Sequence, residues 1–254
     1  MLFLNAIIEI AEQAGQAILE IYQRDPREFN ITDKADATPL TAADLAAHTL
    51  IVNALTTLTP DIPILSEEAA NISWAVRQHW QRYWLVDPLD GTKEFIKRNG
   101  EFTVNIALIE QGEPVLGVVH APVLAKTYYA AKAQGAWLKT ATGSQSIQVS
   151  QTAEVVRVVG SRSHPSPDLA GYLAQLPQHQ LVEVGSSLKF CLVAEGVADV
   201  YPRFGPTMQW DTAAGHIIAL EAGASVQFDG INGPVYQREQ LLNPNFMVSA
   251  LRQS

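Results

Sequence analysis

Two aspartates, Asp87 and Asp90, stand three residues apart at the end of an apolar run, in Trp-Leu-Val-Asp-Pro-Leu-Asp-Gly-Thr at 84–92. The apolar run predicts a strand covered on both faces, and Asp-Pro-Leu-Asp-Gly has the composition of a tight turn. Such a turn would bring both carboxylates together with the Leu89 carbonyl between them. Three oxygens from one short turn suit a hard cation such as Mg²⁺. The alternative is a turn whose aspartates only hydrogen-bond their own backbone.

Two further acidic residues occupy comparable places. Glu67 follows a short apolar run, and Asp211 stands at the expected start of a helix in Trp-Asp-Thr-Ala-Ala-Gly at 210–215. An aspartate at a helix start is usually a cap, so Asp211 also has a purely structural explanation. Four carboxylates and one carbonyl could hold two or three Mg²⁺ ions, which activate a water for phosphoryl displacement. Gly91 and Thr92 are expected to open a helical turn whose free N–H groups would face an anion.

The composition narrows the class of protein. The chain has 254 residues, 47% of them hydrophobic and 17% charged, which predicts a well-packed globular interior. A net charge of −9 argues against a general binder of nucleic acid or anionic membranes. A small phosphorylated ligand is still compatible with this charge, because bound divalent cations reverse the local field. The single cysteine, Cys191, excludes an internal disulfide and is typical of a reducing compartment, so we expect a cytoplasmic protein.

The N-terminal part is expected to begin with two helices. Apolar residues from Leu4 to Ile21 recur on one helical face, and acidic residues interrupt this run, which argues against a signal peptide. A second helix should start at Thr41 and reach about Leu58, with Leu45, Val52 and Leu55 on one face. Its start, Thr-x-x-Asp at 41–44, is typical of a capping box, which gives Asp44 a structural explanation too. No run is long enough to span a bilayer.

The segments after residue 92 divide into two patterns. Strand-like runs with short links imply an antiparallel meander, and a later alternation of strands and helices implies an α/β lobe. We therefore expect an N-terminal α+β lobe at 1–150 and a C-terminal α/β lobe at 151–254, forming one compact unit. The expected strands of the meander are Thr103–Ile109, Val115–His120, Thr127–Ala131, Ala136–Leu138 and Ile147–Val149.

Several blocks resemble a known family. Ser-Glu-Glu at 66–68, Asp-Pro-Leu-Asp-Gly-Thr at 87–92 and the block at 210–215 resemble signatures of the Mg²⁺-dependent, lithium-sensitive phosphatases related to inositol monophosphatase. The longer run at 87–109, with Gly-Ser-Arg-Ser-His at 160–164 and Gly-Ser-Ser-Leu-Lys-Phe-Cys at 185–191, is similar to the bacterial 3′(2′),5′-bisphosphate nucleotidases of that family. The resemblance covers essentially the whole chain. It implies a layered αβαβα sandwich with the active site between the lobes.

The resemblance also implies roles for individual residues. Asp44 and Thr92, together with Glu67, would orient the attacking water. The reacting phosphate would contact the metal ligands and the N–H groups of Gly91 and Thr92. The implied metal ligands are Glu67, Asp87, the Leu89 carbonyl, Asp90 and Asp211.

The second phosphate and the adenosine of a nucleotide would be held on the other side of the site. The residues that match the family's nucleotide contacts are His164, Ser186, Lys189 and Arg203. Alternatively, Lys189 and Arg203 are solvated, and His164 caps the adjoining loop.

The activity implied by the resemblance is hydrolysis of adenosine 3′,5′-bisphosphate to AMP and phosphate. The 3′-phosphorylated sulfate donor of sulfate assimilation would be a second substrate, and lithium would inhibit by competing for one metal position. The nearest alternative is a phosphatase of inositol monophosphate or fructose 1,6-bisphosphate, which would share the metal motifs. Lys189, Arg203 and the basic run at 93–98 favour a doubly charged nucleotide. A non-catalytic sensor would be expected to lack Thr92 or a metal carboxylate, and all are present.

The expected partner is a small nucleotide bisphosphate, with no nucleic acid. The sequence is compatible with a monomer or a homodimer. It is equally compatible with a free cytoplasmic protein and with peripheral association on the cytoplasmic side of the inner membrane.

Overall fold

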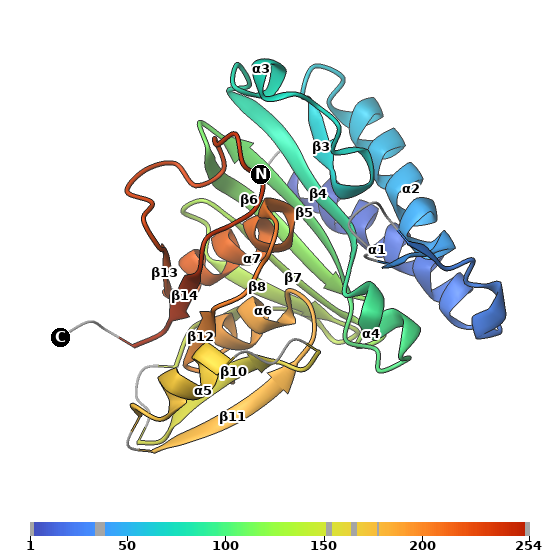
Figure 1. The fold of residues 1–254 in the computed structure, drawn as a ribbon. Helices are drawn as coiled ribbons and strands as arrows, with labels where there is room; N and C mark the ends of the chain where they lie inside the picture. Colours follow the sequence, from blue (N-terminus) through green and yellow to red (C-terminus); the bar gives the residue numbers. More distant parts are fainter. Residues whose placement is uncertain (1–2, 34–38, 151–153, 164–166, 177, 252–254) are drawn as a thin grey trace.

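Five layers of helix and sheet alternate through the molecule, as the expected αβαβα sandwich requires. The computed structural model describes residues 3–33, 39–150, 154–163, 167–176 and 178–251. Helices α1 (Leu4–Tyr22) and α2 (Ala42–Leu58) cover one face of a seven-stranded sheet. Helices α6 (Leu188–Ala194) and α7 (Gln209–Glu221) lie between that sheet and a five-stranded sheet (Figure 1). Helix α5 (Pro167–Leu173) lies on the five-stranded sheet.

The seven-stranded sheet is a meander with one parallel edge strand. Its order is β3-β4-β5-β6-β7-β8-β9, and only the β3–β4 pair is parallel. The predicted antiparallel meander is therefore confirmed, but its last strand lies earlier than predicted, because Gly143 rather than Ile147 begins the pairing with β8. The strands are β3 (Ile64–Ser66), β4 (Arg82–Asp90), β5 (Thr103–Glu110), β6 (Glu113–Ala121), β7 (Lys126–Ala131), β8 (Ala136–Thr140) and β9 (Gly143–Ile147).

The five-stranded sheet has the order β11-β10-β12-β14-β13. Its β10 pairs in parallel with β11 and β12, as the predicted alternation of strands and helices requires. Two further strands, which the sequence did not reveal, pair antiparallel and extend the sheet. The strands are β10 (Val156–Ser161), β11 (His179–Val184), β12 (Val200–Arg203), β13 (Ser225–Phe228) and β14 (Phe246–Ser249).

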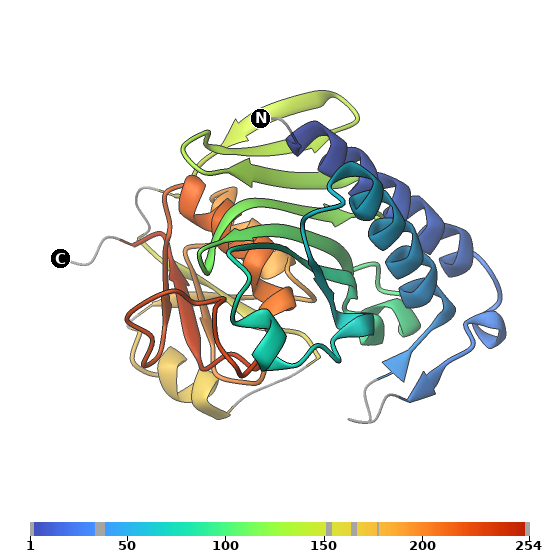
Figure 2. The same ribbon diagram turned by 90° about the horizontal axis from the view of Figure 1, so that it is seen from above.

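Helix α2 buries only part of the face that its sequence suggested: Leu55 is buried as predicted, and Val52 is half-buried. Its buried face includes Ala47, Ile51 and Leu55, whereas Leu45 is 48% exposed. The prediction for Leu45 was wrong because α2 packs beside α1 (Figure 2) and on the seven-stranded sheet, and Leu45 lies largely outside both contacts.

Close packing of α6 on α7 depends on a glycine. A Cβ atom on Gly215 would lie 2.6 Å from Cγ of Phe190, so only glycine fits at this position. The small residues of the 210–215 block therefore let α6 approach α7, and this approach places the start of α6 beside the start of α7. The packing of α7 against both sheets joins the two halves of the chain, while the lobe boundary near residue 150 stays a prediction.

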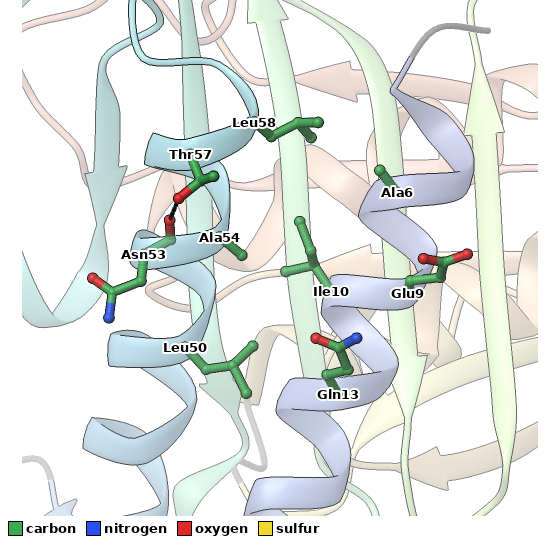
Figure 3. Close-up of a pocket in the computed structure, with 9 residues that line it drawn as sticks. All are labelled: Ala6, Glu9, Ile10, Gln13, Leu50, Asn53, Ala54, Thr57 and Leu58. Atoms are coloured by element: carbon green, nitrogen blue, oxygen red, sulfur yellow. Dashed lines mark hydrogen bonds between the residues drawn. The ribbon is translucent and has the colours of Figure 1, made fainter.

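The outer helical layer carries a groove of about 760 Å³ between α1 and α2 (Figure 3). Its floor includes Ile10 and Leu50, and its rim includes Glu9, Gln13 and Asn53. The groove faces the C-terminal half of α2 and so lies away from Asp44, which belongs to the first turn. Within the part of the chain that the structure describes, each helix is too short or too polar to cross a bilayer.

Candidate active site

Strand β4 carries the two central aspartates across an irregularity in its pairing with β5. Asp87 pairs with Asn105 and Asp90 pairs with Thr103, so β4 uses one more residue than β5 over this interval. This arrangement is a β-bulge. The predicted tight turn was wrong, because the backbone of residues 87–90 continues the strand rather than reversing it.

The bulge puts both aspartates on one face of the sheet. In a regular strand, residues three apart point to opposite faces, and one inserted residue reverses that relation. Leu89 accordingly packs into the apolar cluster beneath α1 and α2. Asp87 and Asp90 both reach the opposite face, where Asp211 and Ser187 lie. A strand with regular alternation would have buried one of the two carboxylates in the core.

A left-handed residue turns the strand into the next helix. Gly91 has a φ of +96°, and α4 (Thr92–Ile96) begins immediately after it. A Cβ atom here would lie 3.3 Å from the Glu101 carbonyl oxygen, and an L side chain rarely adopts this φ. The predicted helical turn after the acidic motif is thus confirmed, and Thr92 occupies its first position.

Three carboxylates from distant parts of the chain meet at this face. Oxygens of Glu67, Asp87 and Asp211 lie within 4.8 Å of one another. Burial raises the pKa of Asp87 well above its ordinary value, and the charges of Glu67, Asp90 and Asp211 raise it further. Burial likewise raises the pKa of Asp211, with added repulsion from Asp90 and Glu67. Because hard divalent cations prefer oxygen ligands that carry negative charge, this cluster can hold a metal ion.

Two of these carboxylates are fixed by backbone hydrogen bonds. The N–H of Leu89 donates to Oδ1 of Asp87 at 3.1 Å, and the N–H of Met208 donates to Oδ2 of Asp211 at 2.8 Å. The second bond is one half of a capping box at the start of α7. The structural and the ligand explanations of Asp211 are therefore compatible, since the cap occupies one of its two oxygens.

Asp44 combines a cap and a site contact in the same way. Its Oδ2 accepts from the N–H of Thr41 at 2.8 Å and from Oγ1 of Thr41 at 2.6 Å. Its Oδ1 lies 3.2 Å from Oγ1 of Thr92, which is also 3.4 Å from the Leu89 carbonyl oxygen. The predicted capping box forms, and the same buried carboxylate joins α2 to the first residue of α4.

A pair of cations flanks the acidic cluster. Lys189 is buried, and its Nζ donates to the carbonyl of Ser186 at 2.6 Å. Burial lowers the pKa of Lys189 to about 8, against the attraction of Asp90 and with added repulsion from Arg203. Ser186 has a φ of +48°, a strained value for a serine. The solvated interpretation of Lys189 is wrong, and two cations near each other favour an anion between them.

A pocket of about 530 Å³ extends from Arg203 along the five-stranded sheet. Arg203 is held at its mouth by hydrogen bonds to the carbonyls of Gly205 and Pro206. The pocket combines a cation, hydroxyl groups and aromatic rings, which is the chemistry that a nucleoside requires. Its lining includes Ser161, Ser163, Leu169, Tyr201, Arg203 and Phe204.

The basic run at 93–98 contributes less to the site than its sequence suggested. Lys97 donates to Ser163 at the pocket, at 2.9 Å. Arg98 instead lies 4.8 Å from the ring centre of Tyr22 and bonds to the carbonyl of Arg24. His164, also predicted to contact the nucleotide, lies outside the described residues.

The sequence did not predict two buried polar residues of the site. Oγ of Ser187 lies 2.6 Å from Oδ2 of Asp90, and Nδ2 of Asn105 lies 2.8 Å from Oγ of Ser187. An asparagine inside the otherwise apolar run of β5 was a signal for Asn105, because buried amides need partners. Ser187 had no comparable signal, since its role depends on the packing of α6 against β4.

Comparison with known proteins gives one consistent relationship. The profile of the inositol monophosphatase family matches residues 2–250. The chain is 58% identical to the 3′(2′),5′-bisphosphate nucleotidase CysQ of Salmonella typhimurium, over 97% of this chain and 99% of that protein. It is 56% identical to the protein of the same name from Escherichia coli K12, with the same coverage. The crystal structure of CysQ from Bacteroides thetaiotaomicron superposes with a TM-score of 0.86 at 44% identity, covering 98% of each chain.

Replacing Asp44 by asparagine separates its two roles. In Asp44→Asn the amide oxygen can keep the cap, because asparagine caps well, while the amide N–H₂ reverses the hydrogen bond to Thr92. We expect kcat for the bisphosphate nucleotide to fall by at least about 10²-fold, with the melting temperature almost unchanged. Thr41→Ala is the graded control, since it removes one of the two bonds that hold Oδ2 of Asp44 but keeps the carboxylate, so it should lower the melting temperature and reduce kcat much less than Asp44→Asn does. An unchanged kcat in Asp44→Asn would rule out the water-orienting role.

Removing one carboxylate from the cluster should alter how stability responds to pH and to Mg²⁺. A raised pKa means that the folded chain binds a proton more tightly than the unfolded chain. The ionisation of Asp87 therefore lowers the free energy of unfolding as pH rises. Without metal, Asp87→Asn should therefore have a higher melting temperature than wild type at pH 8. This difference should be smaller at pH 5. Mg²⁺ at 100-fold above its Kd should raise the melting temperature of wild type by about 5–10 °C.

The same titration in Asp87→Asn supplies the control. Its melting temperature should respond weakly to Mg²⁺, because one charged ligand of the cation is lost. An equal response of both proteins to Mg²⁺ would contradict the placement of the cation at this cluster.

Proposed function

Because the chain belongs to the inositol monophosphatase family, we propose that it is a Mg²⁺-dependent 3′(2′),5′-bisphosphate nucleotidase. It removes the 3′-phosphate of adenosine 3′,5′-bisphosphate and releases AMP and phosphate. The observation that carries the proposal is the buried Lys189, with Arg203 nearby, beside the acidic cluster. The charges of Asp90 and Asp211 act on Lys189, and Arg203 acts on both Lys189 and Asp211, so the four groups lie near one another. A substrate with two phosphates matches such a site.

The chain's oxygen ligands suit Mg²⁺. Glu67, Asp87, Asp90, Asp211 and the Leu89 carbonyl would hold two or three ions, and the raised pKa values of Asp87 and Asp211 show how unfavourable the cluster is without positive charge. Bound Mg²⁺ would supply an activated water and neutralise the charge that develops on the reacting phosphate.

The Asp44–Thr92 pair orients the attacking water. When the Thr92 hydroxyl donates a hydrogen bond to Oδ1 of Asp44, its lone pairs are free to accept a hydrogen bond from a water on the site side. Asp44 is held by the cap of α2 and cannot turn away, so the orientation of this pair is set before substrate binds. N–H groups of Gly91 and Thr92, at the start of α4, would contact the oxygens of the reacting phosphate.

The 5′-phosphate and the nucleoside occupy the opposite side of the site in this proposal. Lys189 and Arg203 neutralise the 5′-phosphate, and the strained backbone of Ser186 directs polar groups toward it. The nucleoside extends into the 530 Å³ pocket, where Tyr201 and Phe204 supply aromatic surface. The 3′-phosphorylated sulfate donor carries the same ribose 3′-phosphate and is proposed as a second substrate.

We also propose a cytoplasmic location. A cytoplasmic enzyme of sulfate assimilation would keep Cys191 reduced, and this thiol is buried in the core, where burial raises its pKa and keeps it unreactive.

Phosphate release from three substrates tests the function. The purified protein with Mg²⁺ should favour adenosine 3′,5′-bisphosphate over inositol 1-phosphate by at least about 10² in kcat/KM, because two charged hydrogen-bond donors serve only the second phosphate. Fructose 1,6-bisphosphate tests whether two phosphates suffice without a nucleoside. Asp90→Asn should lose at least about 10² in turnover as the inactive control. A preference for inositol 1-phosphate or fructose 1,6-bisphosphate would refute the nucleotidase.

Lys189 gives the residue-level test of substrate choice. Lys189→Met keeps the buried volume and removes the charge, so kcat/KM for adenosine 3′,5′-bisphosphate should fall by roughly 1.5–3 kcal/mol, or about 10–150-fold. Inositol 1-phosphate should be affected much less.

The pH dependence provides a second readout of Lys189. A pKa of about 8 means that the ammonium is present below this pH and is lost as pH rises through it. Because kcat/KM reports the free enzyme, wild type should lose its preference for the bisphosphate above about pH 8, and Lys189→Met should show no such step. Equal losses on both substrates would assign Lys189 to the common part of the site.

A further inference from the structure

Ser187 and Asn105 form a hydrogen-bonded link behind Asp90. Oγ of Ser187 lies 2.6 Å from Oδ2 of Asp90 and 2.7 Å from the carbonyl oxygen of Asp211. Nδ2 of Asn105 lies 2.8 Å from Oγ of Ser187 and 3.4 Å from Oδ2 of Asp90. Asn105 is 1% exposed and Ser187 is 2% exposed, so water does not compete for these contacts.

The link joins four elements at one point. Asp90 ends β4, Asn105 lies in β5, Ser187 precedes α6, and Asp211 lies in the first turn of α7 (Figure 1). One carboxylate oxygen of Asp90 is thereby occupied by protein donors, which restricts rotation of the carboxylate. The Ser187 hydroxyl has one proton for two acceptors, Oδ2 of Asp90 and the carbonyl of Asp211, and its close contact with both oxygens sets the separation of two proposed metal ligands.

Asn105 is a poor choice for stability alone. Its Oδ1 is buried and has no hydrogen-bond partner among the described residues. The reversed amide would place Oδ1 3.4 Å from a carboxylate oxygen, so charge repulsion excludes that orientation. An apolar side chain of the same shape would avoid the cost of the unpaired oxygen. A residue that costs stability in this way and contacts a metal ligand is expected to serve the site.

We infer that Asn105 and Ser187 are positioning residues that set the affinity of the site for its divalent cation, by holding Asp90 in one orientation at a fixed separation from Asp211. The inference rests on the proposed metal-dependent function and deepens it. Neither side chain is needed to touch substrate, because both act through the carboxylate of Asp90.

Asn105→Leu in the full chain tests this inference. Mn²⁺ affinity, measured by electron paramagnetic resonance, should weaken by at least about tenfold, as expected when a group that orients a metal ligand is lost. The melting temperature without cation should stay the same or rise, because the unpaired oxygen is removed. The Mg²⁺ concentration at half-maximal nucleotide hydrolysis should rise by the same factor, with kcat at saturating Mg²⁺ within about threefold of wild type.

Thr103→Val is the matched control. Thr103 lies two residues earlier in β5, is fully buried, and its Oγ1 also lacks a hydrogen-bond partner among the described residues. Thr103 is the cross-strand partner of Asp90, but the isosteric valine removes no hydrogen bond to it, so Mn²⁺ affinity should match wild type. Ser187→Ala should weaken Mn²⁺ binding as Asn105→Leu does, and the double variant should show less than the sum, because both changes break one network.

The possible results distinguish the positioning role of Asn105 and Ser187 from the proposed metal-dependent function. Unchanged Mn²⁺ affinity in Asn105→Leu, or an equal loss in Thr103→Val, overturns the positioning role. If Asn105→Leu does not fold, unchanged affinity in Ser187→Ala overturns it in the same way. A wild-type protein that binds no Mn²⁺ and hydrolyses no nucleotide refutes the proposed function itself, and the inference falls with it.

Discussion

Repulsion between closely spaced carboxylates is the constraint on which the architecture of the site depends. Glu67, Asp87 and Asp211 bring oxygens within 4.8 Å of one another, with Asp90 beside them, and the raised pKa values of Asp87 and Asp211 record the cost. Left to themselves, such groups would rotate apart or take up protons. The fold prevents rotation by anchoring aspartates through one oxygen. A bound divalent cation would make the uptake of protons unnecessary.

The anchors come from ordinary elements of secondary structure. Capping boxes hold Asp44 and Asp211, and a backbone N–H two residues further along β4 holds Asp87. Each of these bonds would exist in a protein without a catalytic site. Here they give precision, because a carboxylate with one oxygen fixed keeps the other in a defined direction. The capping role and the ligand role of these residues are therefore compatible, since one side chain can serve both.

The cations of the site repel one another, as the carboxylates do. Lys189 is buried next to Arg203, and burial together with that neighbour lowers its pKa to about 8. An anion relieves the repulsion of the cations, as a metal relieves that of the carboxylates. A nucleotide with two phosphates would supply that anion through one phosphate, while its other phosphate would reach the metal side of the site. The close approach of α6 to α7 at Gly215 brings the two halves together.

The main elements, the meander, the acidic motifs and the family resemblance could be predicted from the amino-acid sequence, because periodicity, caps and short motifs are local properties of the chain. It could not distinguish a tight turn from a bulge at 87–90, since the same residues suit both and only pairing with β5 inserts the extra residue. The exposure of Leu45 depended on where α1 lies, and the contacts of Ser187 and Asn105 depended on how α6 meets β4 and β5. Tertiary structure decided these features, because each arises from contacts between segments far apart in the chain.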